Sequence, residues 1–225
     1  MSVLLISDNP EFGGIWTYAL RQRGLEAAHA RTGQEAGKRL QEDSYALVII
    51  DIYAQEQDSI ALCQQVRPQT TSPLLLLTSR GDEGYVLAAY EAGVDECIVK
   101  PLSPSLFLAK IAVWLRHSRT GAGSQETKGP LAFRLDPVRR QVIRADGTLV
   151  RLTYLECRVL QLLLTHTNQV LDSGYIIDVV WGYRGDVDGA LLKNVVYRLR
   201  NKIEPDPHRP TYIQTVPGEG YLFSG

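Results

Sequence analysis

The stretch VLLISDN, residues 3–9, joins a run of four apolar residues to three polar ones. Four apolar residues in a row are typical of a strand that is buried on both faces of a parallel sheet. An Asp directly after such a strand is most often a turn former or a helix cap. Asp8 therefore gains a functional meaning only if neighbouring strands end in the same way.

Three more apolar runs in the first half of the chain end abruptly in a polar side chain. ALVII, residues 46–50, runs into Asp51; PLLLL, residues 73–77, runs into Thr78; and ECIV, residues 96–99, runs into Lys100. Helical patterns separate these runs, and a fainter strand covers residues 25–30. This alternation predicts an α/β, doubly wound, five-stranded parallel sheet.

A small, polar, glycine-containing stretch around residues 117–129 divides the chain. We expect a first domain at 1–118, a linker at 119–128 and a second domain at 129–225. The second domain shows short strands up to residue 152, three helical segments and a terminal hairpin that turns at 217–220. The helical segments are Thr153–His166, Ser173–Trp181 and Asp188–Ile203. This order predicts an α+β winged helix-turn-helix domain.

Composition sets limits on location and partners. The first 117 residues hold ten Lys/Arg against fourteen Asp/Glu, and the remainder holds fourteen against eleven. The two domains are therefore expected to have different partners. No apolar run reaches the roughly 18 residues that span a bilayer, and the start of the chain lacks a signal-peptide pattern. Cys63, Cys97 and Cys157 are too far apart for a CxxC motif, which fits a cytoplasmic protein with no membrane partner.

Polar strand ends at one edge of a parallel sheet predict a common site. Asp8, Asp51, Thr78 and Lys100 should converge there, because ligands bind beyond the carboxyl ends of such strands. Two carboxylates suit a hard divalent cation such as Mg²⁺. An ammonium and a hydroxyl can hold the oxygens of a phosphoryl group, and Asp51 is then a candidate nucleophile.

The first half resembles the receiver domain of bacterial two-component response regulators. The matching residues are Asp8, Asp51, Asp58, Thr78 to Asp82, Glu91 to Gly93, Asp95 and Lys100-Pro101. The resemblance implies that a sensor histidine kinase phosphorylates Asp51. It also implies a metal site at Asp8, Asp51 and Tyr53, phosphoryl-binding and switch positions at Thr78, Lys100 and Cys97, and a cis Lys100-Pro101 bond.

Residues 188–203 predict an amphipathic helix. Leu192, Val196, Leu199 and Ile203 share one face of it. The opposite face carries amide and basic side chains, which suits a major groove because amides pair with adenine edges and cations with guanine or phosphate.

The second half resembles the DNA-binding domain of the OmpR/PhoB family, which covers most of the remaining chain. The carriers include the segments VVWG at 179–182, VYRLR at 196–200 and YIQTVPGEGY at 212–221. The resemblance implies promoter DNA as a partner, a homodimer on direct repeats, and a loop at Tyr183 to Val187 that touches RNA polymerase. The residues expected to contact DNA are Lys193, Asn194, Tyr197, Arg198, Arg200 and Asn201.

Several positions depart from the receiver pattern. Ser7 stands where a second acid is usual, and Cys97 replaces an aromatic switch residue. The loop after Asp51, which normally carries Pro and Gly, holds Gln55 and Ser59 instead. These departures predict weaker metal binding and a different switch.

Two surfaces also depart from the family. In the wing, Pro217 and Leu222 stand where basic residues are common, and Glu219 lies at the tip, which predicts weak minor-groove contact. The dimerisation face keeps some charge at Asp95, Glu96 and Lys110. Positions that are often charged there carry apolar side chains, which are Val86, Ala88 and Leu106.

The leading hypothesis is a non-enzymatic transcription regulator that accepts phosphate on Asp51 and binds promoter DNA as a dimer. The alternative is an atypical regulator that dimerises without phosphate, which the Ser7, Cys97 and apolar positions favour. A rival of another class is an enzyme with phosphatase-like hydrolysis. It would need a general acid or base beside Asp51, and the sequence pattern offers none.

Overall fold

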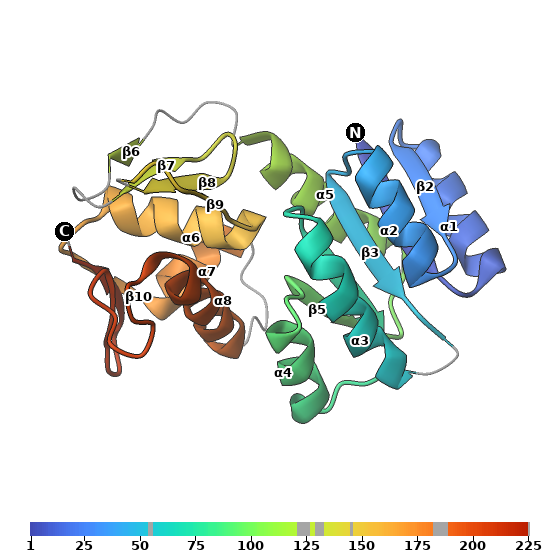
Figure 1. Cartoon of the computed structure of the whole chain (residues 1–225). Coiled ribbons are helices and arrows are strands. Elements are labelled where there is room, and N and C mark those ends of the chain that lie inside the picture. Colours follow the sequence, from blue (N-terminus) through green and yellow to red (C-terminus); the bar gives the residue numbers. More distant parts are fainter. Residues whose placement is uncertain (54–55, 121–126, 129–132, 145, 182–188, 225) are drawn as a thin grey trace. The chain divides into compact units, whose positions relative to one another are not determined.

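The chain divides into two compact units, Met1–Arg119 and Thr120–Gly225, in a computed structural model (Figure 1). The structure describes residues 1–53, 56–120, 127–128, 133–144, 146–181 and 189–224, of which 56–58, 117–120 and 127–128 are described by their backbone alone. Helix α5 continues to Thr120 and a short strand, β6, begins at Thr127. The predicted linker 119–128 stays a prediction, because residues 121–126 lie outside the described residues.

The first unit alternates strands with helices, as predicted. Its strands are β1 (Ser2–Ser7), β2 (Glu26–Ala30), β3 (Leu47–Asp51), β4 (Leu74–Thr78) and β5 (Glu96–Val99). Its helices are α1 (Pro10–Arg21), α2 (Gly33–Glu42), α3 (Glu56–Val66), the 3₁₀ turn η1 (Arg67–Gln69), α4 (Glu83–Glu91) and α5 (Pro104–Thr120).

The five strands form one parallel sheet in the order β2-β1-β3-β4-β5. Every residue of β3 and β4 is buried, because helices cover both faces of the sheet (Figure 1). Continuous apolar runs are what such strands require. The prediction of a doubly wound α/β unit is confirmed.

Side-chain caps begin three of these helices close to the carboxyl ends of the strands. Asn9 accepts hydrogen bonds from the main-chain N–H groups of Glu11 and Phe12 at the start of α1. Thr32 does the same for α2, and Asp82 does so for α4. Each cap satisfies donors that a helix leaves unpaired in its first turn. The polar residues after the strands are therefore partly explained by helix capping.

The core of the first unit contains large aromatic side chains and, between Asp95 and Arg67, a buried ion pair. Trp16 of α1 and Phe107 of α5 contact edge to face, with ring centroids 4.1 Å apart. Asp95, which is fully buried, accepts hydrogen bonds from Arg67 at 3.0 Å and from the main-chain N–H of Leu74 at 2.9 Å. Asp95 thus ties the turn before β5 to β4 and η1.

Among its described residues, the second unit holds two antiparallel sheets and three helices. Its elements are β6 (Thr127–Lys128), β7 (Phe133–Asp136), β8 (Gln141–Arg144), β9 (Leu149–Arg151), α6 (Tyr154–Thr165), β10 (Val170–Asp172), α7 (Ser173–Trp181), α8 (Gly189–Ile203), β11 (Ile213–Val216) and β12 (Gly220–Phe223). The sheets run β6-β7-β8-β9 and β10-β12-β11. The predicted winged helix-turn-helix is confirmed.

Helix α6 forms the centre of the second unit. It begins with a capping box in which Thr153 and Glu156 each accept a hydrogen bond from the other's main-chain N–H. This arrangement satisfies two donors of the first turn at once. Leu160 and Leu163 of α6 are fully buried, as are Val195 and Leu199 of α8.

In the part of the chain that the structure describes, no helix combines the length and apolarity of a membrane span.

Replacing Leu163 with Ala is expected to lower the free energy of unfolding of the second unit by about 2–5 kcal/mol, because a fully buried leucine is lost and a cavity remains. Leu149→Ala is the matched control; this leucine is 59% exposed, so its loss should change stability by less than about 0.5 kcal/mol. A urea titration of the full chain, read by hydrogen exchange of peptides from residues 133–224, measures both. Equal effects of the two substitutions would contradict this description of the core.

Candidate functional site

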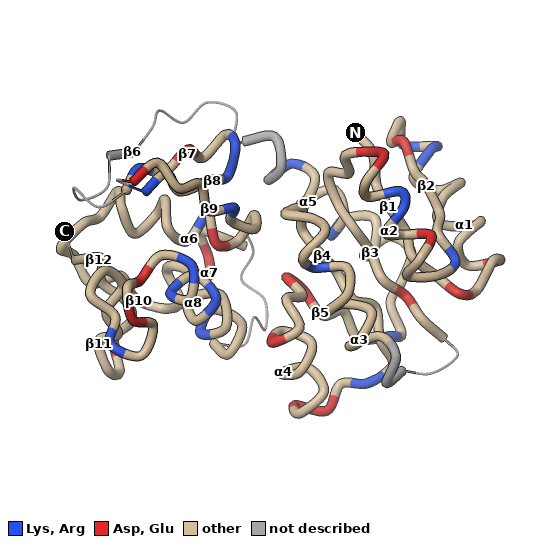
Figure 2. The backbone as a smooth tube through the Cα atoms, viewed as in Figure 1, with Lys and Arg blue, Asp and Glu red and all other residues tan. Residues whose placement is uncertain are grey.

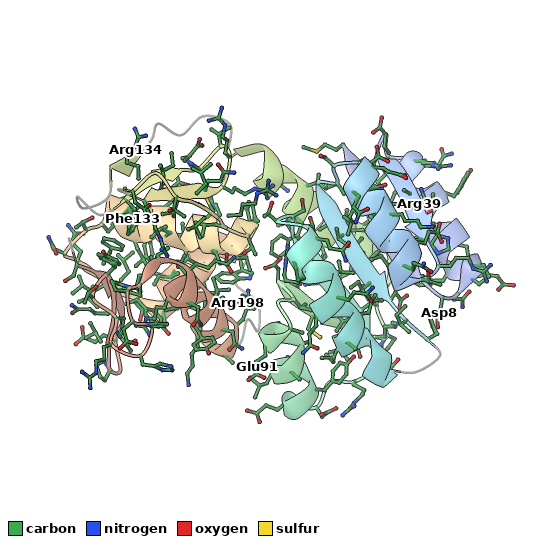
Figure 3. The ribbon with its side chains drawn as sticks, in the orientation of Figure 1. Asp8, Arg39, Glu91, Phe133, Arg134 and Arg198 are labelled. Carbon is green, nitrogen blue, oxygen red and sulfur yellow. The ribbon has the colours of Figure 1, made fainter. Side chains whose placement is uncertain are left out.

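Parallel register brings the predicted polar residues to one edge of the sheet. Ser7 at the end of β1 pairs with Asp51 at the end of β3, and Asp51 pairs in turn with Leu77 of β4. Thr78 and Lys100 follow on the next strands, where Thr78 pairs with Val99. Figure 3 labels Asp8 near the end of the sheet to which the arrow of β3 points in Figure 1.

Asp51 and Lys100 form the charged centre of this edge. Lys100 Nζ lies 2.5 Å from Asp51 Oδ1, and the Asp51 side chain is fully buried. Burial raises the pKa of the Asp51 carboxyl, Lys100 lowers it, and the neighbouring charge of Asp8 raises it. Among the described residues, none donates a hydrogen bond to the second oxygen, Asp51 Oδ2. Asp51 thus has one oxygen fixed by Lys100 and a second, buried oxygen whose lone pairs have no hydrogen-bond donor among the described residues.

Asp8 and Tyr53 lie at the same edge. Asp8 Oδ1 accepts a hydrogen bond from the main-chain N–H of Tyr53 at 2.9 Å. The Tyr53 ring covers the ammonium of Lys100, with Nζ 3.8 Å from the ring centroid. Among the side chains that the structure describes, no group of three His, Cys, Asp or Glu residues could hold a metal. A metal here would rest on two carboxylates, with carbonyl or water oxygens completing its shell.

Of the predicted phosphoryl-binding and switch residues, Thr78 and Lys100 lie at the strand ends, whereas Cys97 lies further back in the sheet. Thr78 is buried and its Oγ1 accepts a hydrogen bond from the main-chain N–H of Arg80 at 3.0 Å. The Lys100-Pro101 bond is cis, as the resemblance implied. Cys97 pairs with Leu76 and therefore lies two residues back from the strand ends. Burial raises the pKa of the Cys97 thiol to about 12, so it is protonated at neutral pH.

Ser7, the last residue of β1, is buried. Its side chain is fully buried, and its hydroxyl accepts a hydrogen bond from the main-chain N–H of Asn9 at 3.3 Å. The carbonyl of Ser7 lies 2.9 Å from Nε2 of His29 on the neighbouring strand. The sequence pattern placed His29 away from the site, whereas the structure brings its ring next to the end of β1.

In the second unit, helix α8 presents a mixed polar and aromatic surface. Lys193 and Asn201 are exposed, Tyr197 is 56% exposed, and Asn194 is half-buried. Figure 2 shows the basic residues along α8. The predicted apolar face of the same helix is buried, with Leu191 added to it. These four side chains lie on the surface of the helix that the sequence analysis assigned to DNA.

The prediction that Arg198 lies on the outward face of α8 is wrong. Its side chain is only 16% exposed, and its Nε lies 3.6 Å from Oε1 of Glu156 (Arg198 is labelled in Figure 3). Lys202, one turn further along α8, lies 2.6 Å from the other carboxylate oxygen of Glu156. Glu156 is almost completely buried, and a buried carboxylate requires such cationic partners. Arg198 therefore stabilises the contact between α6 and α8.

Arg200 is also engaged within its own unit. Its guanidinium donates to the carbonyl of Ile213 at 2.7 Å and to the hydroxyl of Thr215 at 2.8 Å. Glu204, just beyond α8, accepts hydrogen bonds from the main-chain N–H groups of Thr211, Tyr212 and Ile213. Arg200 and Glu204 together attach strand β11, in the C-terminal hairpin, to helix α8.

Sequence reasoning missed several residues that shape both sites. Phe12 contacts Tyr53 with ring centroids 5.5 Å apart, and no sequence signal pointed to this aromatic contact. Thr153 and Glu156 are among the residues that carry the resemblance to the OmpR/PhoB DNA-binding domain, and their spacing is that of a capping box. The ion pairs of Glu156 with α8 could not have been found, because they depend on how the two helices cross.

Replacing Lys100 with Met should lower the free energy of unfolding at pH 7 by about 3 kcal/mol, because it leaves the buried Asp51 carboxylate without its cation. The pKa of folded Asp51, already raised, should rise further above its unfolded value. The penalty is then complete above that raised pKa and decreases as the pH falls from it to the unfolded value, because a protonated Asp51 has no charge to bury.

Urea unfolding at several pH values between 4 and 8 measures the effect of Lys100→Met, with Lys38→Met of the exposed face of α2 as the control. A loss of stability in the Lys100 variant that does not change with pH would show that Asp51 is not the group responsible.

Family models match both halves of the chain. A response regulator receiver domain matches residues 3–112, and the C-terminal domain of transcriptional regulatory proteins matches residues 147–223. A probable transcriptional regulator ycf27 of Guillardia theta is 32% identical over 98% of this chain and 89% of its own length. The DNA-binding response regulator MtrA of Mycolicibacterium smegmatis is 30% identical over 97% of this chain and 95% of its own.

Among solved structures, a point mutant of RitR superposes with a TM-score of 0.79 at 19% sequence identity, over 100% of this chain and 99% of that one. This likeness supports the fold alone. The sequence relatives support more, because their identity extends through both domains. The chain belongs to the two-component response regulators of the OmpR/PhoB type, which are transcription regulators with a receiver domain and a winged-helix DNA-binding domain.

Proposed function

We propose that this regulator accepts a phosphoryl group on Asp51 from a sensor histidine kinase, and that the phosphorylated chain binds promoter DNA as a homodimer. The observation that carries the proposal is the geometry of Asp51. Its carboxylate is fully buried at the sheet edge, with Oδ1 held by Lys100 and with Oδ2 buried but without a hydrogen-bond partner among the described residues. An oriented carboxylate beside a fixed cation is suited to nucleophilic attack on phosphorus.

In the proposed transfer, Asp51 Oδ2 forms a bond to phosphorus as the phosphorus–nitrogen bond of the kinase phosphohistidine breaks. The electron pair of that bond returns to the histidine ring. Lys100 holds the developing negative charge of the phosphoryl oxygens, and Thr78 on the next strand can donate its hydroxyl to one of them. Tyr53 and Phe12 cover this edge with aromatic rings, which limits the access of water to the acyl phosphate.

The residues present fit Mg²⁺ only with a small set of protein ligands. Asp8 and Asp51 would hold it with their carboxylates, and Tyr53 is the third expected ligand through its main chain. The unpartnered, buried Asp51 Oδ2 supports this fit, whereas Ser7 contributes no carboxylate. A bound Mg²⁺ would supply charge neutralisation for the phosphoryl oxygens.

The DNA side of the proposal rests on Lys193, Asn194, Tyr197 and Asn201. These side chains lie on the surface of α8, where amides and an aromatic ring can contact base edges in the major groove. Arg198 and Arg200 contribute indirectly, because their guanidinium groups hold α8 against α6 and the wing. The loop proposed to contact RNA polymerase, 183–187, lies outside the described residues.

A second candidate is dimerisation without phosphate. Its support is an apolar surface on β5 and α5, where Val99 is 43% and Leu106 is 50% exposed. The expected charges of this face are used internally. Asp95 is buried against Arg67, and Glu96 is buried with Lys110 Nζ 2.5 Å away. Light scattering of the unphosphorylated chain over a concentration series tests this candidate, and a strict monomer would refute it.

Incubation of the chain with acetyl phosphate and Mg²⁺ should give a single phosphoryl adduct by intact mass, because Lys100 orients the Asp51 carboxylate and can hold the oxygens of the incoming phosphoryl group. Asp51→Asn should give no adduct, whereas Asp43→Asn, an exposed carboxylate, should behave as the wild-type chain. No adduct on the wild-type chain favours the second candidate. Continuous release of phosphate would support the rival hydrolase.

Replacing Lys193 with Ala should weaken binding to specific and nonspecific duplexes alike, and should reduce the slope of log affinity against log salt by about 1, because one phosphate contact is lost. Arg139→Ala, in the turn between β7 and β8, is the control, because this exposed arginine lies away from α8 in the sequence. Fluorescence anisotropy over a salt series, with a duplex selected from random sequence by the chain itself, provides the measurement. An unchanged slope for Lys193→Ala would remove this residue from the interface.

A further inference from the structure

Tyr85 on α4 is hydrogen-bonded to a neighbouring helix from within the core. Its side chain is buried, and its hydroxyl lies 3.0 Å from the hydroxyl of Ser59 on α3, which is also buried. A hydrogen bond between two buried hydroxyls resists separation, because neither group can replace its partner with water. The Ser59–Tyr85 hydrogen bond therefore fixes the first turn of α4 to α3.

Arg80 connects the same tyrosine to the loop after β4. Its guanidinium carbon lies 4.5 Å from the centroid of the Tyr85 ring, and its Nε lies 3.0 Å from Asp82. Asp82 is the N-cap of α4 and accepts a hydrogen bond from the main-chain N–H of Tyr85. Arg80 thus contacts both the cap of α4 and the ring that fixes this helix to α3.

The main chain of Arg80 is hydrogen-bonded to the phosphoryl-binding residue. Its N–H donates to Thr78 Oγ1 at 3.0 Å. A continuous set of contacts therefore runs from Thr78 through Arg80 to Tyr85 and Ser59. When the Thr78 hydroxyl turns to donate to a phosphoryl oxygen, its oxygen leaves the position that accepts from Arg80. The Arg80 loop then loses one of its contacts with β4.

We infer that Tyr85 is the positioning residue that couples the state of Asp51 to the position of α4. In the unphosphorylated chain, the Tyr85–Ser59 hydrogen bond and the Arg80 guanidinium over the ring hold α4 in place, and rotation of Thr78 releases them. This inference rests on the proposed phosphorylation of Asp51. It joins two departures from the family pattern, because Cys97 supplies no aromatic ring and Ser59 supplies a hydroxyl where glycine is usual.

The test compares the full-length wild-type chain with Tyr85→Phe and Ser59→Ala, each of which removes the hydrogen bond and keeps most of the packing. Tyr18→Phe is the matched control, because it deletes the same atom from a ring that is 66% exposed on α1. Three readouts are taken with and without acetyl phosphate and Mg²⁺. They are the phosphoryl adduct by intact mass, hydrogen exchange of residues 83–91, and affinity for the selected duplex.

Tyr85→Phe and Ser59→Ala should take up the phosphoryl group as fully as the wild-type chain. Without phosphate, their α4 amides should exchange faster and their DNA affinity should rise by about fivefold, the equilibrium factor typical of one hydrogen bond. The ratio of phosphorylated to unphosphorylated affinity should fall by the same factor. A merely structural role would lower thermal stability and leave this ratio unchanged.

A wild-type response ratio in Tyr85→Phe, with normal adduct formation, overturns the inference and leaves the proposed function intact. Absence of an adduct on the wild-type chain refutes the proposed function instead. The coupling would then have no phosphoryl signal to transmit, so the inference would fail together with the proposed function.

Discussion

The ion pair between Asp51 and Lys100 is the interaction around which the first unit is arranged. A carboxylate that is fully buried at the end of a central strand is unfavourable unless a cation compensates it. Lys100, which follows β5 two strands away from β3, provides that cation. Its Nζ lies 2.5 Å from Asp51 Oδ1. The register of β3, β4 and β5 must therefore be fixed to within one residue, because a slip of one residue would turn Asp51 to the other face of the sheet.

Strand ends and helix faces were predictable from the sequence because they depend on local patterns. Continuous apolar runs gave the strands of the sheet, and the polar residues after them gave the location of Asp8 and Asp51. The same holds for α7, whose predicted bounds, Ser173–Trp181, agree with the structure. A run of apolar residues and its first polar neighbour carry this information without reference to the rest of the chain.

The directions of long side chains were not predictable in this way. A helical wheel places Arg198 beside the polar face of its helix, but the buried carboxylate of Glu156 draws it inward. Asp95 reads as a surface charge after a turn, but its carboxylate is fully buried against Arg67. Flexible basic side chains follow the nearest buried anion, and that anion comes from a distant part of the sequence. Such pairs become visible only after the elements are packed.

The attachment of the wing to α8 has a consequence for how operator preference can change. Arg200 and Glu204 bind Thr215 and main-chain groups of β11 and of the segment before it, so these contacts fix the β11–β12 hairpin against α8. Asn194 and Tyr197 lie outside these contacts. Under the proposed role of α8 in the major groove, substituting these two residues changes which base pairs are favoured and leaves the contacts between α8 and the hairpin intact. After gene duplication, two such regulators can therefore acquire different operator preferences through substitutions at Asn194 and Tyr197. The contacts of Arg200 and Glu204 with the hairpin need not change.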